Sequence, residues 1–261
     1  MKACLLVSLA SLVCLLSATI GCNSTGVGNP PRSDTVSMAI VADDESEGVP
    51  SETDGGAEGE SLSQGSLNHA VLVLDSIRWR ACTDATLITV SEGPFVVDLI
   101  TGESRPPLPA VATPPGGFCG FDAPLSTAAR SADLSGRSLF FSGVRADGVP
   151  FLLFSEMRAV LRVRAASGQS WGNQNAPLAV LWAMRPRSWT SRMELADARV
   201  SAWGERRAIV IDIDRNPLLY ALIRARLAGL SQLFVDQDAD GFLDAEDRAA
   251  TIGAGDPDTN E

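Results

Sequence analysis

The clearest chemical pattern in the chain lies near its C-terminus, in the run from Asp236 to Asp247. Carboxylates stand at the first, third, fifth, ninth and twelfth positions of this run, and a glycine stands at the sixth. Calcium binds oxygen ligands in such a loop, where the glycine permits a sharp turn and the seventh residue offers its backbone carbonyl. The sequence therefore predicts a calcium site with the following ligands: Asp236, Asp238, Asp240, Phe242 through its carbonyl, Asp244 and Asp247.

This run resembles an EF-hand-type loop and also resembles the calcium loops of dockerin-like and thrombospondin-like extracellular modules. Asp247 stands where the calmodulin pattern has glutamate. Its shorter side chain reaches the metal less easily, so the resemblance implies an affinity on the order of 10⁻⁴ to 10⁻³ M, where calcium usually has a structural role. An acidic, solvated turn that never binds metal is the alternative.

The N-terminus has the composition of an export signal. After Met1 and Lys2, residues 3–20 are almost entirely apolar, and the run ends in Thr19-Ile20-Gly21-Cys22. This ending resembles the lipobox of bacterial lipoproteins, which implies a signal peptide over residues 1–21 and a lipid on Cys22. Asn23 then implies transfer to the outer membrane. An uncleaved membrane anchor and plain secretion remain alternatives, and all three place the body outside the cytoplasm.

Charge divides the mature chain into parts. The net charge of -11 comes from its two acidic ends, whereas residues 66–235 carry a small excess of scattered arginines. Because these arginines do not cluster, nucleic-acid binding is not expected. Residues 22–66 are rich in Gly, Ser, Asp and Glu and are predicted to form a disordered acidic linker.

Two cysteines remain in the mature body, Cys82 and Cys119. In an oxidising compartment we expect them to form a disulfide. Two buried thiols, or a pair of metal ligands, are the alternatives.

Short apolar runs separated by turn residues predict a mainly β fold, an antiparallel β-sandwich over residues 67–213. The expected strands are Ala70–Trp79, Ala85–Ser91, Phe95–Ile100, Phe118–Leu125, Arg137–Arg145, Pro150–Phe154, Arg158–Ala165, Leu178–Met184 and Arg207–Ile213. Two stretches look helical, Trp189–Val200 and Pro217–Leu230. The second belongs to a C-terminal part, residues 214–261, that holds the small helix, the calcium loop and an acidic tail; the lead-in at residues 233–235 reads as helical or extended.

Three short motifs resemble a family of bacterial surface lipoproteins of unknown function with a transthyretin-like β-sandwich. They are the strand at residues 70–79, the run Phe95-Val-Val-Asp-Leu-Ile-Thr-Gly102, and the turn Pro114-Pro-Gly-Gly-Phe-Cys-Gly120. Phe118 stands where the family usually has tyrosine. The resemblance covers residues 68–165 and implies a fold and a location, but no catalytic residues.

Catalytic motifs are weak. Residues 168–172 match the G-x-S-x-G pattern of serine hydrolases, but loop-forming residues follow and the single histidine, His69, precedes the serine. A carboxylate pair drawn from Asp75, Asp98 and Glu156 would need to meet in space. We therefore expect no enzymatic activity.

The expected function is a non-enzymatic, lipid-anchored envelope module with a structural or adhesive role. Its expected partners are the membrane, through the lipid anchor, and a protein or glycan of unknown identity. The alternative is a lipoprotein that binds a sugar, peptide or small molecule. A pocket lined by tryptophan would favour this alternative, and the candidates are Trp79, Trp182, Trp189 and Trp203.

Overall fold

A computed structural model describes residues 35–43, 66–84, 88–127, 134, 136–172, 177–187, 195–229 and 231–256. The predicted signal peptide, Cys22 and Trp189 lie outside these residues. The fold is mainly β with little helix, which confirms the predicted class. The elements are β1 (Thr35–Ala42), β2 (Ser66–Ala81), β3 (Ile88–Asp98), β4 (Ser104–Arg105), β5 (Val111–Ala112), β6 (Phe118–Pro124), β7 (Leu139–Val144), β8 (Pro150–Ser155), β9 (Val160–Ala165), β10 (Leu178–Met184), η2 (Leu195–Asp197), β11 (Val200–Trp203), β12 (Arg206–Ile211), α2 (Pro217–Gly229), β13 (Ser231–Val235), α3 (Ala245–Arg248) and β14 (Thr251–Gly255).

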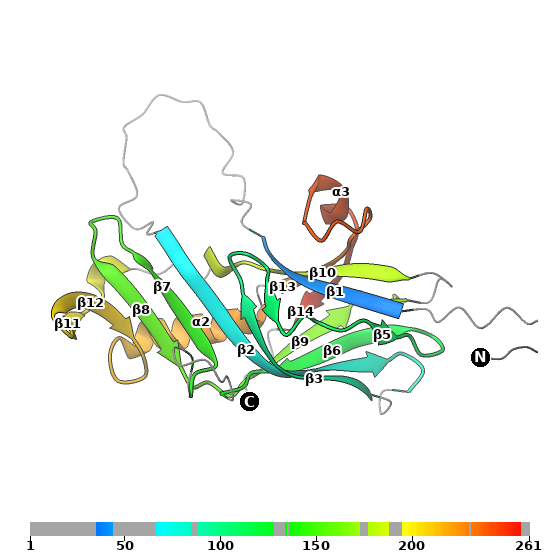
Figure 1. Cartoon of the computed structure of the whole chain (residues 1–261), viewed down its shortest axis with the longest axis horizontal. Helices are drawn as coiled ribbons and strands as arrows, with labels where there is room; N and C mark the ends of the chain where they lie inside the picture. The colour runs from blue at the N-terminus through cyan, green and yellow to red at the C-terminus, as the bar shows by residue number, and fades with distance from the viewer. Residues whose placement is uncertain are drawn as a thin grey trace, which may run out of the picture. The chain divides into compact units, whose positions relative to one another are not determined.

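All described strands belong to one curled, 14-stranded sheet (Figure 1). Its main path runs β11-β12-β8-β7-β2-β6-β9-β14-β13-β10-β1-β5, and β3 with β4 branches from β2. Most neighbouring strands are antiparallel, but β1 runs parallel to β10 and β12 runs parallel to β8. Because the sheet curls, strands that are not hydrogen-bonded neighbours face one another across the core.

Each of the nine predicted strand runs overlaps a strand of the sheet, with outer ends that differ by at most four residues, and residues 85–87 lie outside the described part of the chain. The alternation that predicted them has its usual cause: in β7 and β8, every second side chain is buried. Two predicted runs, 85–91 and 95–100, fall on the single strand β3. Gly93, the middle of the three residues between them, lies so close to β2 that an added Cβ would be 2.5 Å from the carbonyl oxygen of Asp75, so only glycine fits there.

The prediction of a disordered linker over residues 22–66 is wrong for residues 35–42, which form β1. Val36, Met38 and Ile40 alternate along this strand and are buried in the main core. Its backbone pairs with β10 over seven residue positions, from Val36 with Leu178 to Ala42 with Met184. The composition of the surrounding residues hid this alternation. Residues 44–65 lie outside the described part of the chain.

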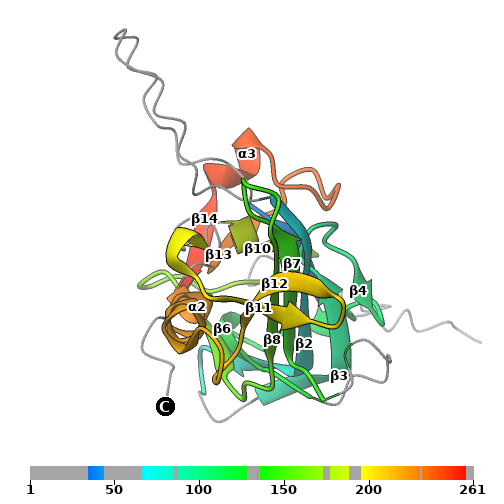
Figure 2. The same ribbon diagram turned by 90° about the vertical axis from the view of Figure 1, so that its left-hand side faces the viewer.

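The C-terminal part is also not a separate appendage. Strands β13 and β14 lie inside the sheet, between β10 and β9 (Figures 1 and 2). The helix α2 was predicted from Pro217 and packs Ile223 and Leu227 into the same core. The predicted boundary at residue 213 therefore separates no structural units. The sequence places the boundary there because the last strand-like run ends at Ile213 and a helix-like stretch follows, whereas the order in which strands pair does not follow the sequence.

The helix predicted at Trp189–Val200 is wrong in its described portion. Leu195–Asp197 forms a single 3-10 turn, and β11 begins at Val200. The buried side chain of Leu195 anchors the turn, and Arg145 donates a hydrogen bond of 2.6 Å to the Leu195 carbonyl. This contact holds the turn against the β7–β8 hairpin.

Aromatic side chains form the centre of the core. Trp79 packs against Phe118 and Phe121, with ring centroids 5.2 and 5.3 Å apart. Phe121 also meets Trp182 edge to face at 4.8 Å, although their strands β6 and β10 are not neighbours in the sheet. These contacts join opposite sides of the curled sheet.

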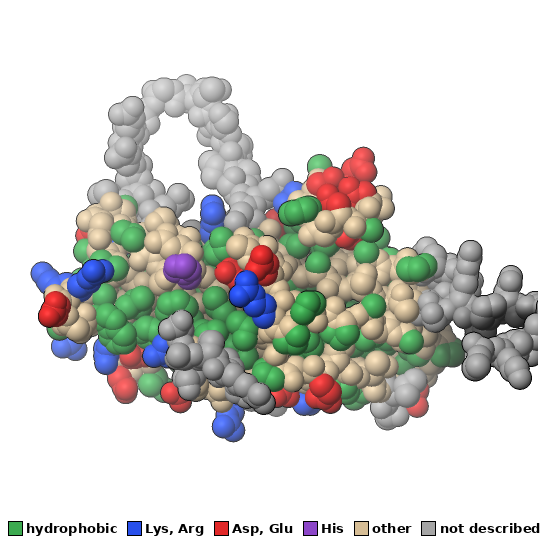
Figure 3. Space-filling view, viewed as in Figure 1, with side chains coloured by type: hydrophobic (Ala, Val, Ile, Leu, Met, Phe, Trp, Pro, Cys, Tyr) green, Lys and Arg blue, Asp and Glu red, His purple; other side chains and the backbone are tan. Residues whose placement is uncertain are grey.

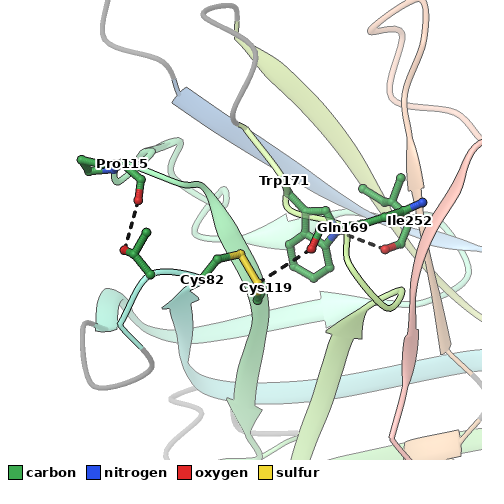
Figure 4. The surroundings of a disulfide bond; sticks show 7 residues. Cys82, Pro115, Cys119, Gln169, Trp171 and Ile252 are labelled. Atoms are coloured by element: carbon green, nitrogen blue, oxygen red, sulfur yellow. Dashed lines mark hydrogen bonds between the residues drawn. A yellow bond between two sulfur atoms is a disulfide. The ribbon is translucent and has the colours of Figure 1, made fainter.

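The predicted disulfide between Cys82 and Cys119 is present and joins the end of β2 to the start of β6 (Figure 4). The same region holds Trp171, whose indole N–H donates a 3.1 Å hydrogen bond to the carbonyl of Ile252. The disulfide and this indole therefore fasten β2, β6 and β14 around one end of the core.

A second cross-strand connection is ionic. Asp122 on β6 is paired with Arg80 on β2 and, at 2.9 Å, with Arg164 on β9. Burial alone would raise the pKa of Asp122, but the hydrogen bonds from Arg80 and Arg164 outweigh it and hold the pKa below its ordinary value. The carboxylate thus holds three neighbouring strands together.

We expect Asp122→Asn to lower the free energy of unfolding by about 1 to 3 kcal/mol at neutral pH, since two partly exposed arginines lose a charged acceptor. Because the folded-state pKa is depressed, this contribution is complete above the unfolded pKa and is lost as the pH falls through the folded value. Urea unfolding at pH 7 and at acidic pH should therefore show a difference between variant and wild type that shrinks on acidification.

Asp75→Asn is a matched control for this prediction, because Asp75 is exposed and its pair with Arg78 is 3.8 Å long. We expect it to change stability by less than about 0.5 kcal/mol. Equal effects of the two substitutions would show that Asp122 has no special structural role.

Candidate metal centre

The predicted calcium loop connects strand β13 to the short helix α3 and then to β14 (Figure 1). The lead-in is extended, since residues 231–235 form β13 with Leu233 and Phe234 buried. Asp236 follows directly, and its backbone N–H donates a 3.1 Å hydrogen bond to the Ala179 carbonyl. The first predicted ligand is therefore fixed to the sheet by the backbone.

Three of the predicted ligands come together in the structure. One carboxylate oxygen from each of Asp236, Asp238 and Asp240 lies within 4.8 Å of the other two. Asp236 is buried, whereas Asp238 and Asp240 are exposed. The cluster therefore has one fixed, desolvated carboxylate and two that face water, so an ion could reach it from solvent.

The backbone of the loop is shaped by its own aspartates. Asp238 accepts from the N–H of Asp240 at 3.2 Å, and Asp240 accepts from the N–H of Phe242 at 2.7 Å. Gly241 has a φ of 80° and donates its N–H to Asp236 at 3.1 Å. A positive φ at this position is the reason that the motif needs glycine.

The carboxylate of Asp236 has an unusual electrostatic environment. The residue is 8% exposed, and its Oδ1 atom is buried without a hydrogen-bond partner among the described residues. Burial raises the pKa of Asp236, and the nearby carboxylate of Asp247 acts in the same direction, against the hydrogen bonds from the backbone at Gly241 and Ala239. A cation at the cluster would supply the charge that this oxygen lacks.

The predicted ligands Asp244 and Asp247 make hydrogen bonds within the loop and its helix instead. Asp244 caps α3 by accepting from the N–H groups of Glu246 and Asp247. Asp247 is 1% exposed, and its two oxygens accept from the N–H groups of Gln237 and Asp244 at 2.9 and 3.1 Å. Its carboxylate joins separate parts of the loop through these hydrogen bonds, so we assign Asp247 a structural role. The side chain of Phe242 is 72% exposed.

One cluster of ion pairs that supports the loop could not be predicted from the motif. Arg248, the last residue of α3, pairs with the buried Asp43 at 3.2 Å, and Arg185 pairs with the other oxygen of Asp43 at 2.7 Å. Asp43 directly follows β1, and Arg185 directly follows β10. This three-residue cluster attaches the helix of the loop to the sheet.

The other residues considered for chemistry form no comparable site. Ser167 and Gly168 form a turn that leads through Ser170 to Trp171 and its bridge with Phe118, unlike the strand-to-helix elbow of a hydrolase. Asp75 and Glu156 are exposed, and one oxygen of Asp98 accepts from the N–H groups of Ile100 and Thr101. Trp79 and Trp182 are buried in the core, but Trp203 is 40% exposed.

Comparison with protein-family models, curated proteins and solved structures finds no match for this chain. The resemblances to transthyretin-like surface lipoproteins and to EF-hand-type loops therefore stay predictions. Among the described residues, no helix is both long and apolar enough to cross a membrane.

The two roles assigned to the aspartates can be separated without any metal. In a calcium chelator, Asp247→Ala should lower the free energy of unfolding by about 1 to 2 kcal/mol, because the N–H groups of Gln237 and Asp244 lose their buried acceptor. Asp240→Ala should have a smaller effect, since Asp240 is exposed and accepts one turn hydrogen bond. Thermal and urea unfolding of both variants checks this order, and equal stabilities would contradict it.

Proposed function

We propose that this protein is a lipid-anchored module of the bacterial cell envelope, without enzymatic activity, and that calcium bound at Asp236, Asp238 and Asp240 stabilises its fold. The observation that carries the calcium proposal is the Oδ1 atom of Asp236, which is buried beside two other carboxylates with no hydrogen-bond partner among the described residues. Such an atom is costly unless a cation or another donor satisfies it.

The chemistry of the ligands favours calcium over softer metals. The three side chains offer carboxylate oxygens, and no histidine or cysteine belongs to the cluster among the described residues. Two of the carboxylates are exposed and can adjust, which suits the larger and less rigid coordination of calcium better than the strict octahedron of magnesium. Water would complete the coordination shell. The affinity expected for such a site remains on the order of 10⁻⁴ to 10⁻³ M.

A structural role follows from the position of the loop. The strands on either side of it, β13 and β14, lie within the sheet, and α3 is attached to Asp43 through Arg248. A metal that orders the loop would therefore also stabilise β1, β10 and β14. This arrangement suits an extracytoplasmic protein, because calcium outside the cell reaches the millimolar range that a weak site needs.

Calcium titration of residues 23–261, which retain β1, tests the proposal. We expect saturable stabilisation, about 1.4 to 2.7 kcal/mol at about 10 mM calcium for the expected affinities. The double variant Asp236→Ala with Asp240→Ala should lose this response. Isothermal titration calorimetry should give one binding event for the wild type and none for the variant.

The matched control removes two acids elsewhere, Glu156→Ala with Glu205→Ala, both of which are exposed. This variant should respond to calcium as the wild type does, since only general charge has changed. A wild type that shows no saturable response up to about 10 mM calcium would reduce the loop to an acidic turn.

The lipid anchor rests on the sequence Thr19-Ile20-Gly21-Cys22 after an apolar run. In a bacterial host that lipidates exported proteins, the wild-type chain should partition into detergent and incorporate labelled fatty acid. Cys22→Ser should abolish the label and prevent normal cleavage. A wild type without label would favour the uncleaved anchor or plain secretion, and label that persists in the variant would place the lipid on a residue other than Cys22.

A further inference from the structure

A groove lies on the outer face of the sheet. It crosses β3, β2, β7 and β8 and reaches Trp203 at the end of β11, with a cavity volume of about 780 Å³. Figure 3 shows hydrophobic side chains gathered on this face, with the protein's single histidine at their border. None of the lining residues belongs to the metal loop.

The floor of the groove is built by cross-strand pairing. Val71 on β2 stands opposite Phe140 on β7, and Phe140 stands opposite Phe154 on β8. These side chains point away from the core, because the buried residues of the same strands occupy the alternate positions. They are half-buried, and the buried side chain of Leu134 packs against Val71 and Phe140, so the groove has an apolar floor with Leu134 at one side.

Three aromatic rings form a row along one side of the floor. The ring centroids of Phe140 and Phe154 lie 5.4 Å apart, and those of Phe154 and Trp203 lie 5.2 Å apart, in both cases stacked. The guanidinium of Arg137 lies 4.0 Å from the centroid of Phe154. This stacking holds the rings in place, so Trp203 remains 40% exposed in a defined position.

The rim of the groove is polar and balanced in charge. Two arginines, Arg105 and Arg137, and two acids, Asp98 and Glu103, line it, together with the exposed imidazole of His69. Arg105 and Glu103 form an exposed ion pair of 3.0 Å with each other, so the rim presents donors and acceptors together around the apolar floor. An anionic ligand would meet the two acids, and a cationic ligand would meet the two arginines.

We propose that this groove binds a neutral carbohydrate chain. Each sugar hydroxyl both donates and accepts hydrogen bonds, so it can use the guanidinium groups, the carboxylates and the imidazole alike. The C–H faces of a pyranose ring are apolar and suit the floor and the exposed indole. A wholly apolar partner would instead desolvate the four charged side chains of the rim without replacing their hydrogen bonds to water. This site is independent of the proposed calcium site.

The test uses full-length protein in detergent, with calorimetry and tryptophan fluorescence as readouts. The neutral probes are cellohexaose, hexa-N-acetylchitohexaose and maltohexaose. The charged probes are hexagalacturonate and a fully deacetylated chitosan hexamer. We expect saturable binding of at least one neutral probe with an affinity better than about 1 mM, and weaker binding of the charged probes. Trp203→Ala should weaken that binding about tenfold or more, whereas Trp203→Phe should retain most of it.

Ile213→Ala is the matched control, because Ile213 is also an exposed hydrophobic residue, at 72%, and does not line the groove. It should bind the probe as the wild type does. The proposal is overturned if no neutral probe binds, if only a charged probe binds, or if Trp203→Ala binds unchanged. It is also overturned if sedimentation shows dimers that Trp203→Ala dissociates, since a second copy would then occupy the groove. A calcium chelator should not abolish sugar binding. The groove proposal can therefore fail or succeed independently of the calcium proposal.

Discussion

The carboxylate of Asp43 joins the parts of the sheet that the sequence separates most widely. It is 3% exposed and accepts from Arg185 and Arg248, which follow β10 and end α3. A buried charge of this kind requires both partners, so the positions of β1, β10 and the helix of the metal loop depend on one another. The geometry of the acidic cluster is thus connected to a residue nearly two hundred positions earlier in the chain.

Features that depend on local patterns could be predicted from the sequence. Alternation located the strands of the body, and Pro217 marked the start of α2. Strands β1 and β14 could not be found in the same way. The acidic surroundings of β1 obscured its few apolar residues, and β14 contains two glycines, of which Gly253 is required because an added Cβ would lie 2.6 Å from the carbonyl oxygen of Arg164. Both strands exist because distant strands pair with them.

The same distinction applies to the two sites. The spacing of Asp236, Asp238 and Asp240 is a local property, so the motif predicted which carboxylates come together. The inward orientation of Asp247 depends on hydrogen bonds across the loop, which spacing does not reveal. The aromatic row could not be predicted from the sequence, because it depends on the register of β7 with β8 and on the position of Trp203 beside Phe154. No periodicity in the sequence brings those three rings together.

The position of β1 changes how the body would sit at a membrane. The first described strand begins at Thr35, so if the lipid is on Cys22 the chain between these two residues spans at most about 45 Å when fully extended. A disordered linker over residues 22–66, as the composition predicts, would have let the body move further from the bilayer and rotate freely. With β1 in the sheet and a lipid on Cys22, the body would instead be confined to a thin layer above the bilayer, and its binding partners would have to reach that layer.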